Sequence, residues 1–277
     1  MNKNLTLSNI IRLILVCTGG ALMLFPLFIV ISTSLKISGA EVVFPPVLIP
    51  KPVAWENYIK VWQVVPFFTF LKNSVIITSV CLIGRLFSNL LIGYAFARLH
   101  FPGRDILFMI CISTMMLPGI VTIIPMFVLY RILGWVNTFL PLTVHSFFGS
   151  AFLIFMSRQF FRGIPMEYDE AARVDGASTL RIWWEVLLPN SIPLAIVISI
   201  YSFLWDWNDF MGPLIYLHSQ DKFTLALGLR TFMGYISYSW NYLMAGAVIM
   251  IAPVIIFFLF TQRYFIQGIS MTGLTGR

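Results

Sequence analysis

Long apolar runs without a single charge are the feature that most constrains what this chain can fold into. The run 13–31 holds 19 residues and no lysine, arginine, aspartate or glutamate. A helix needs roughly 20 apolar residues to cross about 30 Å of hydrocarbon. A soluble domain would carry about 25% charged residues, whereas this chain has 10% charged and 59% hydrophobic residues. The sequence therefore predicts an all-α integral membrane protein with about six transmembrane helices.

The chain divides into spans and loops where charges and prolines gather. Spans are expected at 13–34, 70–97, 106–130, 138–157, 191–217 and 242–261. The remaining parts are an N-terminal stretch at 1–12, outer loops at 35–69 and 218–241, a charged segment at 158–190 and a tail at 263–277. The first span is too long for a signal peptide, whose apolar region has roughly 7–15 residues. Pro118 and Pro125 should kink the third span, because neighbouring helices can satisfy the carbonyls that a proline frees.

The placement of lysine and arginine predicts which side each loop faces. With the N-terminus inside, ten basic residues face the cytoplasm and seven face outside, which agrees with the positive-inside rule. We therefore expect a multi-pass protein of the cell membrane with both termini in the cytoplasm. The net charge is +7, but the basic residues stand singly at the ends of apolar runs. Membrane lipid, and not nucleic acid, is the expected partner of these charges.

The segment 158–190, called the charged segment below, holds nine of the charged residues. Pro165 and the acidic residues after it favour a helix start, Gly176 can end that helix in the left-handed conformation, and Ser178 or Thr179 can cap a second helix. The second helix would carry an apolar stripe of Leu180, Trp183, Trp184, Leu187 and Leu188. Two interpretations stay open: a docking surface for another protein, or a solvated loop whose tryptophan pair lies on the membrane surface.

A spaced motif in the charged segment carries a family resemblance. Glu170-Ala171-Ala172, three residues, Gly176, nine residues, Val186, and then Leu188-Pro189 resembles the EAA loop of ATP-binding-cassette importer permeases. That family usually has isoleucine where this chain has Val186. The motifs Trp207-Asn208-Asp209-Phe210 and 262–268 are similar to the carbohydrate-uptake, MalG-like branch of the family. The resemblance covers nearly the whole chain.

The resemblance implies the type I importer permease fold over residues 70–262 and a cytoplasmic ATPase as partner of the charged segment. The docking residues would be Glu170, Ala171, Ala172, Asp175, Gly176, Leu188 and Pro189. It further implies a second permease subunit, two ATPase subunits that bind ATP and Mg, and an extracytoplasmic sugar-binding protein toward which the loop 218–241 would reach. The chain would form part of the translocation pathway of an ATP-driven carbohydrate importer that works by alternating access.

The sequence shows no motif for catalysis, metal binding or cofactor binding. No Gly-Lys dipeptide occurs, so no Walker A loop can cradle phosphate. No Ser/His/Asp or paired-carboxylate constellation stands out, and Cys17, Cys81 and Cys111 have neither metal-ligand nor disulfide spacing. We expect no catalytic residue, metal or cofactor in this chain, which argues against a membrane enzyme. The remaining rival is a secondary transporter that works without an ATPase, which would show inverted repeats; we find no internal repeat.

Two groups of polar residues are expected within spans. Arg85 lies about 15 residues into the second span, roughly 22 Å deep, with no carboxylate partner evident at its depth. Arg85 is a candidate for lining the translocation pathway or for pairing with a partner subunit; alternatively, it snorkels or forms a structural ion pair within the bundle. Asn208 and Asp209, near Asp206, are candidates for the outer end of the pathway, or belong to a hydrated helix end with an aromatic belt. The transported sugar cannot be identified from these residues.

Overall fold

The computed structural model describes residues 7–272 apart from 40–42, 44–46 and 234–238, and it describes no side chain beyond 262. All regular structure among the described residues is helical, which confirms the predicted all-α class. Within these described residues, four helical stretches are long and apolar enough to cross a membrane: Ser8–Ser34, Phe67–Arg98, Leu140–Gly163 and Trp240–Gln262. Two bent helix pairs raise the count of spans to six if each pair is one span. The expected six spans lie within that range.

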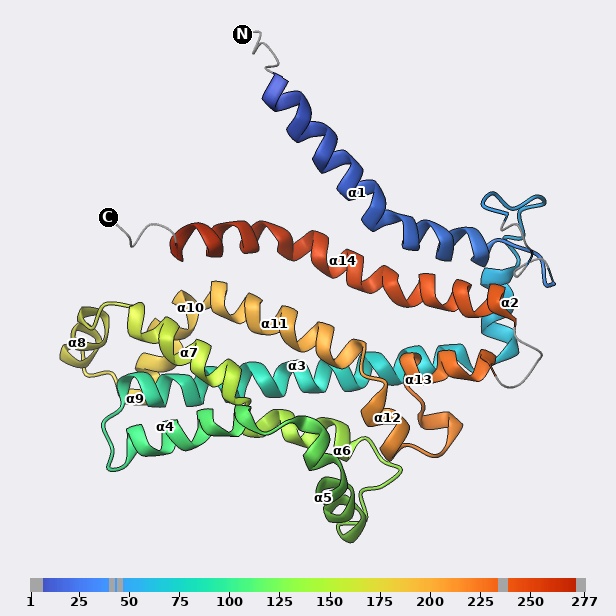
Figure 1. The fold of residues 1–277 in the computed structure, drawn as a ribbon. Coiled ribbons are helices and arrows are strands. Elements are labelled where there is room, and N and C mark those ends of the chain that lie inside the picture. The colour runs from blue at the N-terminus through green and yellow to red at the C-terminus, as the bar shows by residue number, and fades with distance from the viewer. Residues whose placement is uncertain (1–6, 40–42, 44–46, 234–238, 273–277) are drawn as a thin grey trace. The chain divides into compact units, whose positions relative to one another are not determined.

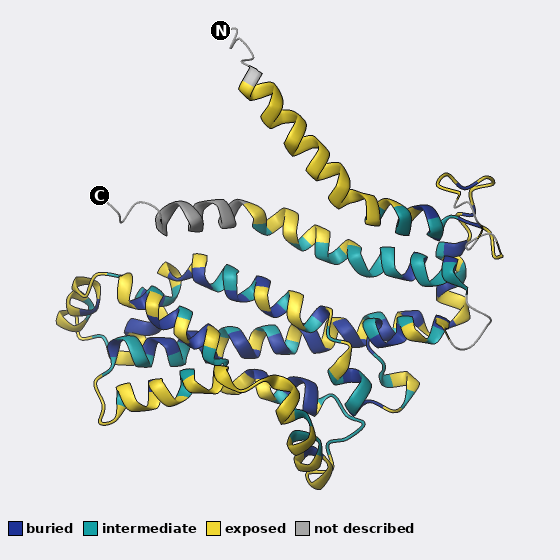
Figure 2. Ribbon diagram, viewed as in Figure 1, coloured by how far each residue is buried: buried dark blue, intermediate teal, exposed yellow. Residues whose placement is uncertain are grey.

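The chain forms two compact units, and the smaller consists of residues 1–68 and 228–253. It contains α1 (Leu7–Ser34), α2 (Asn57–Val64), the 3₁₀ turn η5 (Arg230–Met233) and the first part of α14 (Trp240–Thr272). The fully buried Asn57 side chain donates to the carbonyls of Ser34 and Lys36, both at 2.8 Å. Asn241 donates in turn to Asn57 at 3.3 Å. These amides join α2 to the ends of α1 and α14, whereas most of α1 itself is exposed (Figure 2).

The larger unit consists of residues 69–227 and 254–277. Its long helix is α3 (Phe67–Arg98), and the others are α4 (Arg104–Ser113), α5 (Gly119–Ile132), α6 (Leu140–Thr143), α7 (Ala151–Gly163), α8 (Glu167–Val174), α9 (Thr179–Arg181), α10 (Leu188–Asn190), α11 (Ile192–Trp207), α12 (Met211–Tyr216) and α13 (Leu225–Leu229). Short 3₁₀ turns lie at Thr114–Met116, Val144–Phe148 and Gln220–Lys222, and a π-helical turn lies at Ile182–Leu187. Helix α7 contacts both α4 and α11.

One core of this unit lies where α3, α7 and the charged segment meet. Its buried members include Tyr94, Phe161, Ile182, Leu187 and Ile198. Gly93 of α3 lies so close to Ser157 of α7 that a Cβ at position 93 would collide with the serine Cβ. The two helices therefore approach each other closely only because residue 93 has no side chain.

The third expected span, 106–130, consists of two helical pieces that are bent by 102°. The bend falls at Leu117 and Pro118, both with extended backbone (ψ 116° and 130°). A proline disfavours the helical conformation of the residue before it. The helix therefore breaks at Leu117, and the chain turns sharply where the sequence predicted a kink. Pro125, by contrast, lies inside α5 without ending it.

The fourth and fifth expected spans also differ from the observed helices. The span expected at 138–157 is interrupted at Gly149, whose φ is +82°, and its last helix continues to Gly163. The span expected at 191–217 ends at Trp207 and is followed by α12. Asp209 accepts a hydrogen bond from the backbone N–H of Gly212 at 3.1 Å, and this contact fixes the turn between the two helices.

Candidate functional site

The charged segment folds into the two helical pieces that its sequence predicts. Helix α8 has Glu167, Asp169 and Glu170 in its first turn, where the helix dipole favours negative charge. Gly176 then adopts a left-handed conformation with φ +79°. The hydroxyl of Ser178 accepts from the backbone N–H of Arg181 at 3.4 Å and caps the next helix. From there the chain stays helical to Asn190 through α9, the π-helical turn and α10.

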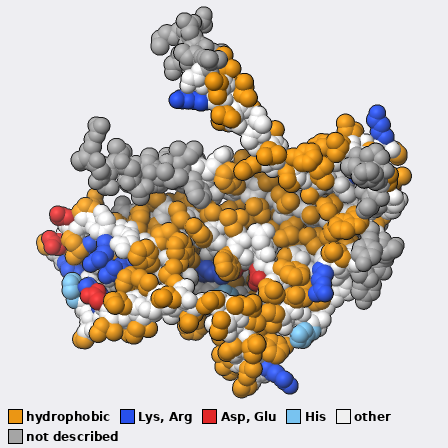
Figure 3. Space-filling model, in the orientation of Figure 1, with side chains coloured by type: hydrophobic (Ala, Val, Ile, Leu, Met, Phe, Trp, Pro, Cys, Tyr) orange, Lys and Arg blue, Asp and Glu red, His pale blue; other side chains and the backbone are white. Residues whose placement is uncertain are grey.

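The outer face of the charged segment exposes both charges and apolar side chains. Glu170, Ala171, Asp175, Gly176 and Pro189 are all exposed. Among the apolar side chains, Val174 is 88% exposed, and Leu180 and Trp184 are also exposed. Figure 3 shows blue and red side chains gathered at the end of the molecule where Figure 1 labels α8.

The inner face of the same segment is part of the core. Ile182, Trp183 and Leu187 are buried, and Ala172 and Leu188 are half-buried against the same cluster. The expected apolar stripe is therefore divided between two faces. The adjacent tryptophans differ in exposure although their ring centroids lie 5.7 Å apart: Trp183 is buried and packs edge-on against Phe87 at 6.0 Å, whereas Trp184 is exposed.

The C-terminal end of α3 holds both helices of the charged segment. Tyr94 donates a hydrogen bond to the carbonyl of Thr179 in α9 at 3.3 Å. Arg98 donates to the carbonyl of Ile164 at 2.5 Å, and its Nε lies 3.4 Å from Oδ2 of Asp169 in α8. The side chains of this ion pair are 3% and 0% exposed.

The Arg98–Asp169 pair was not predicted from the sequence. A basic residue at the end of a span fits the positive-inside rule by itself, and Asp169 stands next to the more distinctive Glu170. Glu167, Asp169 and Glu170 point in different directions around α8, but the sequence does not show which of them faces α3.

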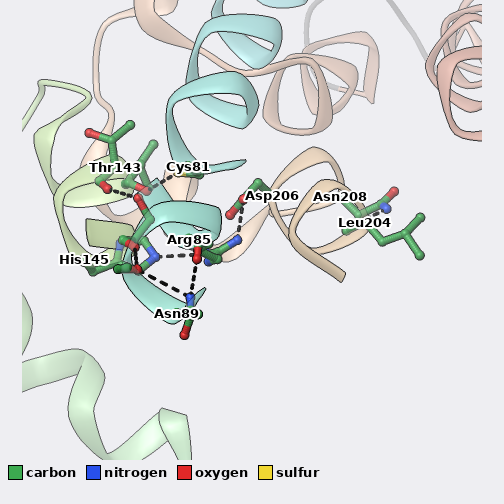
Figure 4. Close-up of polar contacts among 11 residues, drawn as sticks. Cys81, Arg85, Asn89, Thr143, His145, Leu204, Asp206 and Asn208 are labelled. Carbon is green, nitrogen blue, oxygen red and sulfur yellow. Dashed lines mark hydrogen bonds and ion pairs between the residues drawn. The ribbon is translucent and has the colours of Figure 1, made fainter. Parts of the chain in front are cut away.

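A second polar cluster lies near the middle of α3 (Figure 4). Arg85 Nη1 contacts Oδ2 of Asp206 at 2.5 Å, and its Nη2 lies 3.3 Å from Nε2 of His145. One turn along α3, Asn89 donates to the backbone carbonyl of Arg85 at 2.6 Å and accepts from the N–H of Ser150 at 2.8 Å. The cluster thus ties α3 to α11 and to the interrupted helix before α7.

Asp206 is the carboxylate partner that Arg85 lacks in the sequence interpretation. Depth along each span, taken separately, does not show that the last turn of α11 faces the middle of α3, so the partner could not be identified from the sequence. The observed contact supports a structural ion pair within the bundle, one of the alternatives given above for Arg85.

The other two pathway candidates do not join this cluster. Asn208 ends α11, is exposed, and donates to the carbonyl of Leu204 at 2.8 Å; in Figure 4 it lies apart from the Arg85 side chain. Asp209 is half-buried in the turn before α12. In the part of the chain that the structure describes, no group of three or more histidine, cysteine, aspartate or glutamate residues could hold a metal ion.

Comparison with known proteins identifies the family to which this chain is similar. Residues 89–271 match the family described as the binding-protein-dependent transport system inner membrane component. The chain is 32% identical over 246 residues to the arabinooligosaccharides transport system permease protein AraQ of Halalkalibacterium halodurans, covering 88% of this chain and 86% of the relative. It is 29% identical over 264 residues to the sn-glycerol-3-phosphate transport system permease protein UgpE of Yersinia pestis, covering 92% and 94%.

A solved structure agrees in fold over nearly the whole chain. It is a chain in the crystal structure of a bacterial ABC transporter involved in the import of the acidic polysaccharide alginate. The TM-score is 0.82 at 25% identity, and the match covers 96% of this chain and 99% of the other. The protein therefore belongs to the family of binding-protein-dependent transport system inner membrane components, as a multi-pass permease of an ABC importer whose ATPase activity lies in partner subunits.

Proposed function

We propose that this chain is the permease subunit of an ATP-driven carbohydrate importer and that its charged segment docks onto a cytoplasmic ATPase subunit. The observation that carries the proposal is the two-faced packing of that segment. Its inner face is fixed in the core by Ile182 and Leu187, whereas its outer face presents Glu170, Val174 and Leu180 to the surroundings. A surface that is held rigidly and exposes apolar side chains is typical of a protein interface.

The seven docking residues divide into three roles under this proposal. Glu170 and Asp175 offer charge to a basic groove, and Ala171 and Gly176 let another backbone approach closely. Ala172 and Leu188 lie at the edge where the segment meets the core, so they would keep the outer face in place, and the exposed Pro189 would belong to that outer face. Because Trp183 is buried, the alternative of a tryptophan pair lying on the membrane surface has less support.

The assembly around this chain would contain a second permease, two ATPase subunits and an extracytoplasmic sugar-binding protein. Both termini would lie in the cytoplasm, in line with the excess of basic residues on that side of the predicted topology. ATP binding, with Mg, would close the ATPase pair, draw the charged segments together and turn the pathway outward. ATP hydrolysis would then reset it.

A carbohydrate substrate is supported by the name of one of the two relatives. One is an arabinooligosaccharide permease and another an sn-glycerol-3-phosphate permease. Asn208 and Asp209 remain candidates for the pathway, since their side chains lie at the break between α11 and α12. Arg85 would act by holding α3 against α11, because Asp206 neutralises its charge.

Co-purification and uptake test the docking proposal together. The chain is co-expressed with its neighbouring genes, and the ATPase retained on the purified complex is measured beside ATP-dependent uptake in proteoliposomes. Gly176→Asp should abolish both, since an aspartate side chain adds bulk and charge at an exposed left-handed position. The matched control is Gly103→Asp, which is also left-handed and has open space around it but lies outside the charged segment.

Two results would overturn the docking proposal. One is a purified unmodified complex without ATPase. The other is a Gly176→Asp variant that takes up substrate at the normal rate, which would favour a secondary transporter that needs no ATPase. The substrate class is tested with radiolabelled arabino-oligosaccharides, maltose, sn-glycerol-3-phosphate and alginate oligomers. ATP-dependent uptake restricted to the non-carbohydrate probe would contradict the carbohydrate proposal.

A further inference from the structure

Two residues one turn apart at the end of α3 each hold a different helix of the charged segment. Residues four positions apart lie on the same face of a helix. Tyr94 reaches the backbone of α9, and Arg98 reaches α8 and the chain before it. One face of α3 therefore contacts both helical pieces of the charged segment.

Helix α8 buries one side chain completely and packs Ala172 partly against the core. Asp169 is its one fully buried residue, and the rest of the helix is exposed or half-buried. The carboxylate faces Arg98, which also donates from Nη1 to the sulfur of Met166 and from Nη2 to the carbonyl of Ile164. The guanidinium thus contacts both the start of α8 and the residues that lead into it.

The contact between Arg98 and Asp169 is a charge contact without a hydrogen bond. Neither oxygen of Asp169 has a hydrogen-bond partner, and neither does Nε of Arg98. Attraction between two charges in a buried site is strong and falls only gradually with distance. Such a contact can pull α8 toward α3 over a range of separations, whereas a hydrogen bond needs a narrow geometry.

We propose that Arg98 and Asp169 are positioning residues that pass displacement of α8 to α3. The inference rests on the proposed function, in which an ATPase moves the charged segment. A force on the exposed face of α8 reaches α3 through this pair, and α3 in turn is bonded to α11 by Arg85 and Asp206. Without the pair, α8 would follow the ATPase while the membrane helices stayed behind.

The experiment measures coupling separately from assembly. The complete complex is reconstituted with Asp169→Asn, Arg98→Met or both changes, and with Lys60→Gln as control. Lys60 forms an exposed ion pair with Glu56 in the smaller unit, so Lys60→Gln removes one positive charge, as Arg98→Met does, but far from the charged segment in the sequence. The readouts are the abundance of complex and the number of sugar molecules imported per ATP hydrolysed. The probe is the labelled carbohydrate with the greatest uptake in the panel above.

We expect each single variant to import at least about fivefold less sugar per ATP, the lower end of usual coupling effects. The double variant should regain abundance, because no buried charge is left alone, but its sugar-to-ATP ratio should stay low. A purely structural pair would change abundance and leave the ratio normal in all variants, which would overturn the inference. An unmodified complex that shows no ATP-dependent carbohydrate uptake would instead overturn the proposed function on which the inference rests.

Discussion

Helix α3 carries two buried arginine–aspartate pairs that are built differently. Arg85 contacts Asp206 at 2.5 Å through Nη1 and His145 through Nη2. Arg98, about 20 Å further along the helix at 1.5 Å per residue, lies 3.4 Å from Asp169 and gives its hydrogen bonds to a carbonyl and a sulfur instead. The first carboxylate is bonded, and the second is held by charge alone.

The difference suggests two mechanical roles for one helix. A short, hydrogen-bonded pair fixes α3 to α11, because small shifts weaken hydrogen bonds steeply. A longer pair tolerates a shift of its partner and still attracts it. Helix α3 would therefore move as one body with α11 and remain loosely joined to α8.

The largest effect is expected where the bonded pair is broken. Asp206→Asn leaves the buried Arg85 without its countercharge, which should cost about 3–5 kcal/mol of folding free energy. We expect a strong fall in the thermal unfolding temperature of the purified protein and in its membrane abundance. The double variant Arg85→Met/Asp206→Leu should recover most of the loss. A single variant as stable as the unmodified protein would show that the pair is not a structural joint.

The loose pair should cost less when it is broken. Asp169→Asn leaves Arg98 with its bonds to Ile164 and Met166, so we expect about 1–3 kcal/mol, measured by the same thermal unfolding. If Asp169→Asn destabilised the protein as much as Asp206→Asn, the distinction between a bonded and a loose pair would be wrong.

The contact between α3 and α7 lies between the two pairs and can be tested by adding one methyl group. Gly93→Ala forces a Cβ against Ser157 and its backbone, and overpacking of this kind costs about 1–3 kcal/mol. Gly119→Ala is the matched control, because nothing lies within 4 Å of a Cβ at that helical position. Equal stability of the two variants would mean that α3 and α7 can separate freely.

Much of the fold could be predicted because its signals are local. Uncharged apolar runs locate the spans, and Gly176 with Ser178 divides the charged segment into its helices. The sharp bend at Pro118 is harder to predict, because proline in a span can give a gentle kink or a full break. The surrounding helices decide which of the two forms. Trp183 and Trp184 likewise share one apolar stripe by spacing, yet successive helix residues point about 100° apart.

The candidate site was less accessible to prediction because its contacts are distant in sequence. The Arg85–Asp206 and Arg98–Asp169 pairs join residues far apart along the chain. No periodicity within one helix shows which face meets which neighbour. The family motif contains the exposed Glu170, whereas the buried residue beside it, Asp169, faces Arg98 of α3.

The smallest effect is expected at Tyr94, the other contact between α3 and the charged segment. Tyr94→Phe removes the hydrogen bond to the carbonyl of Thr179 and keeps the ring packed against Phe161, so the expected loss is about 0.5–1.5 kcal/mol. Because Tyr94 holds α9 and Arg98 holds α8, the losses from Tyr94→Phe and Asp169→Asn should add if the two helices are held independently. A combined loss smaller than the sum would mean that α8 and α9 detach together, so that the whole charged segment, and not α8 alone, is the body that α3 must follow.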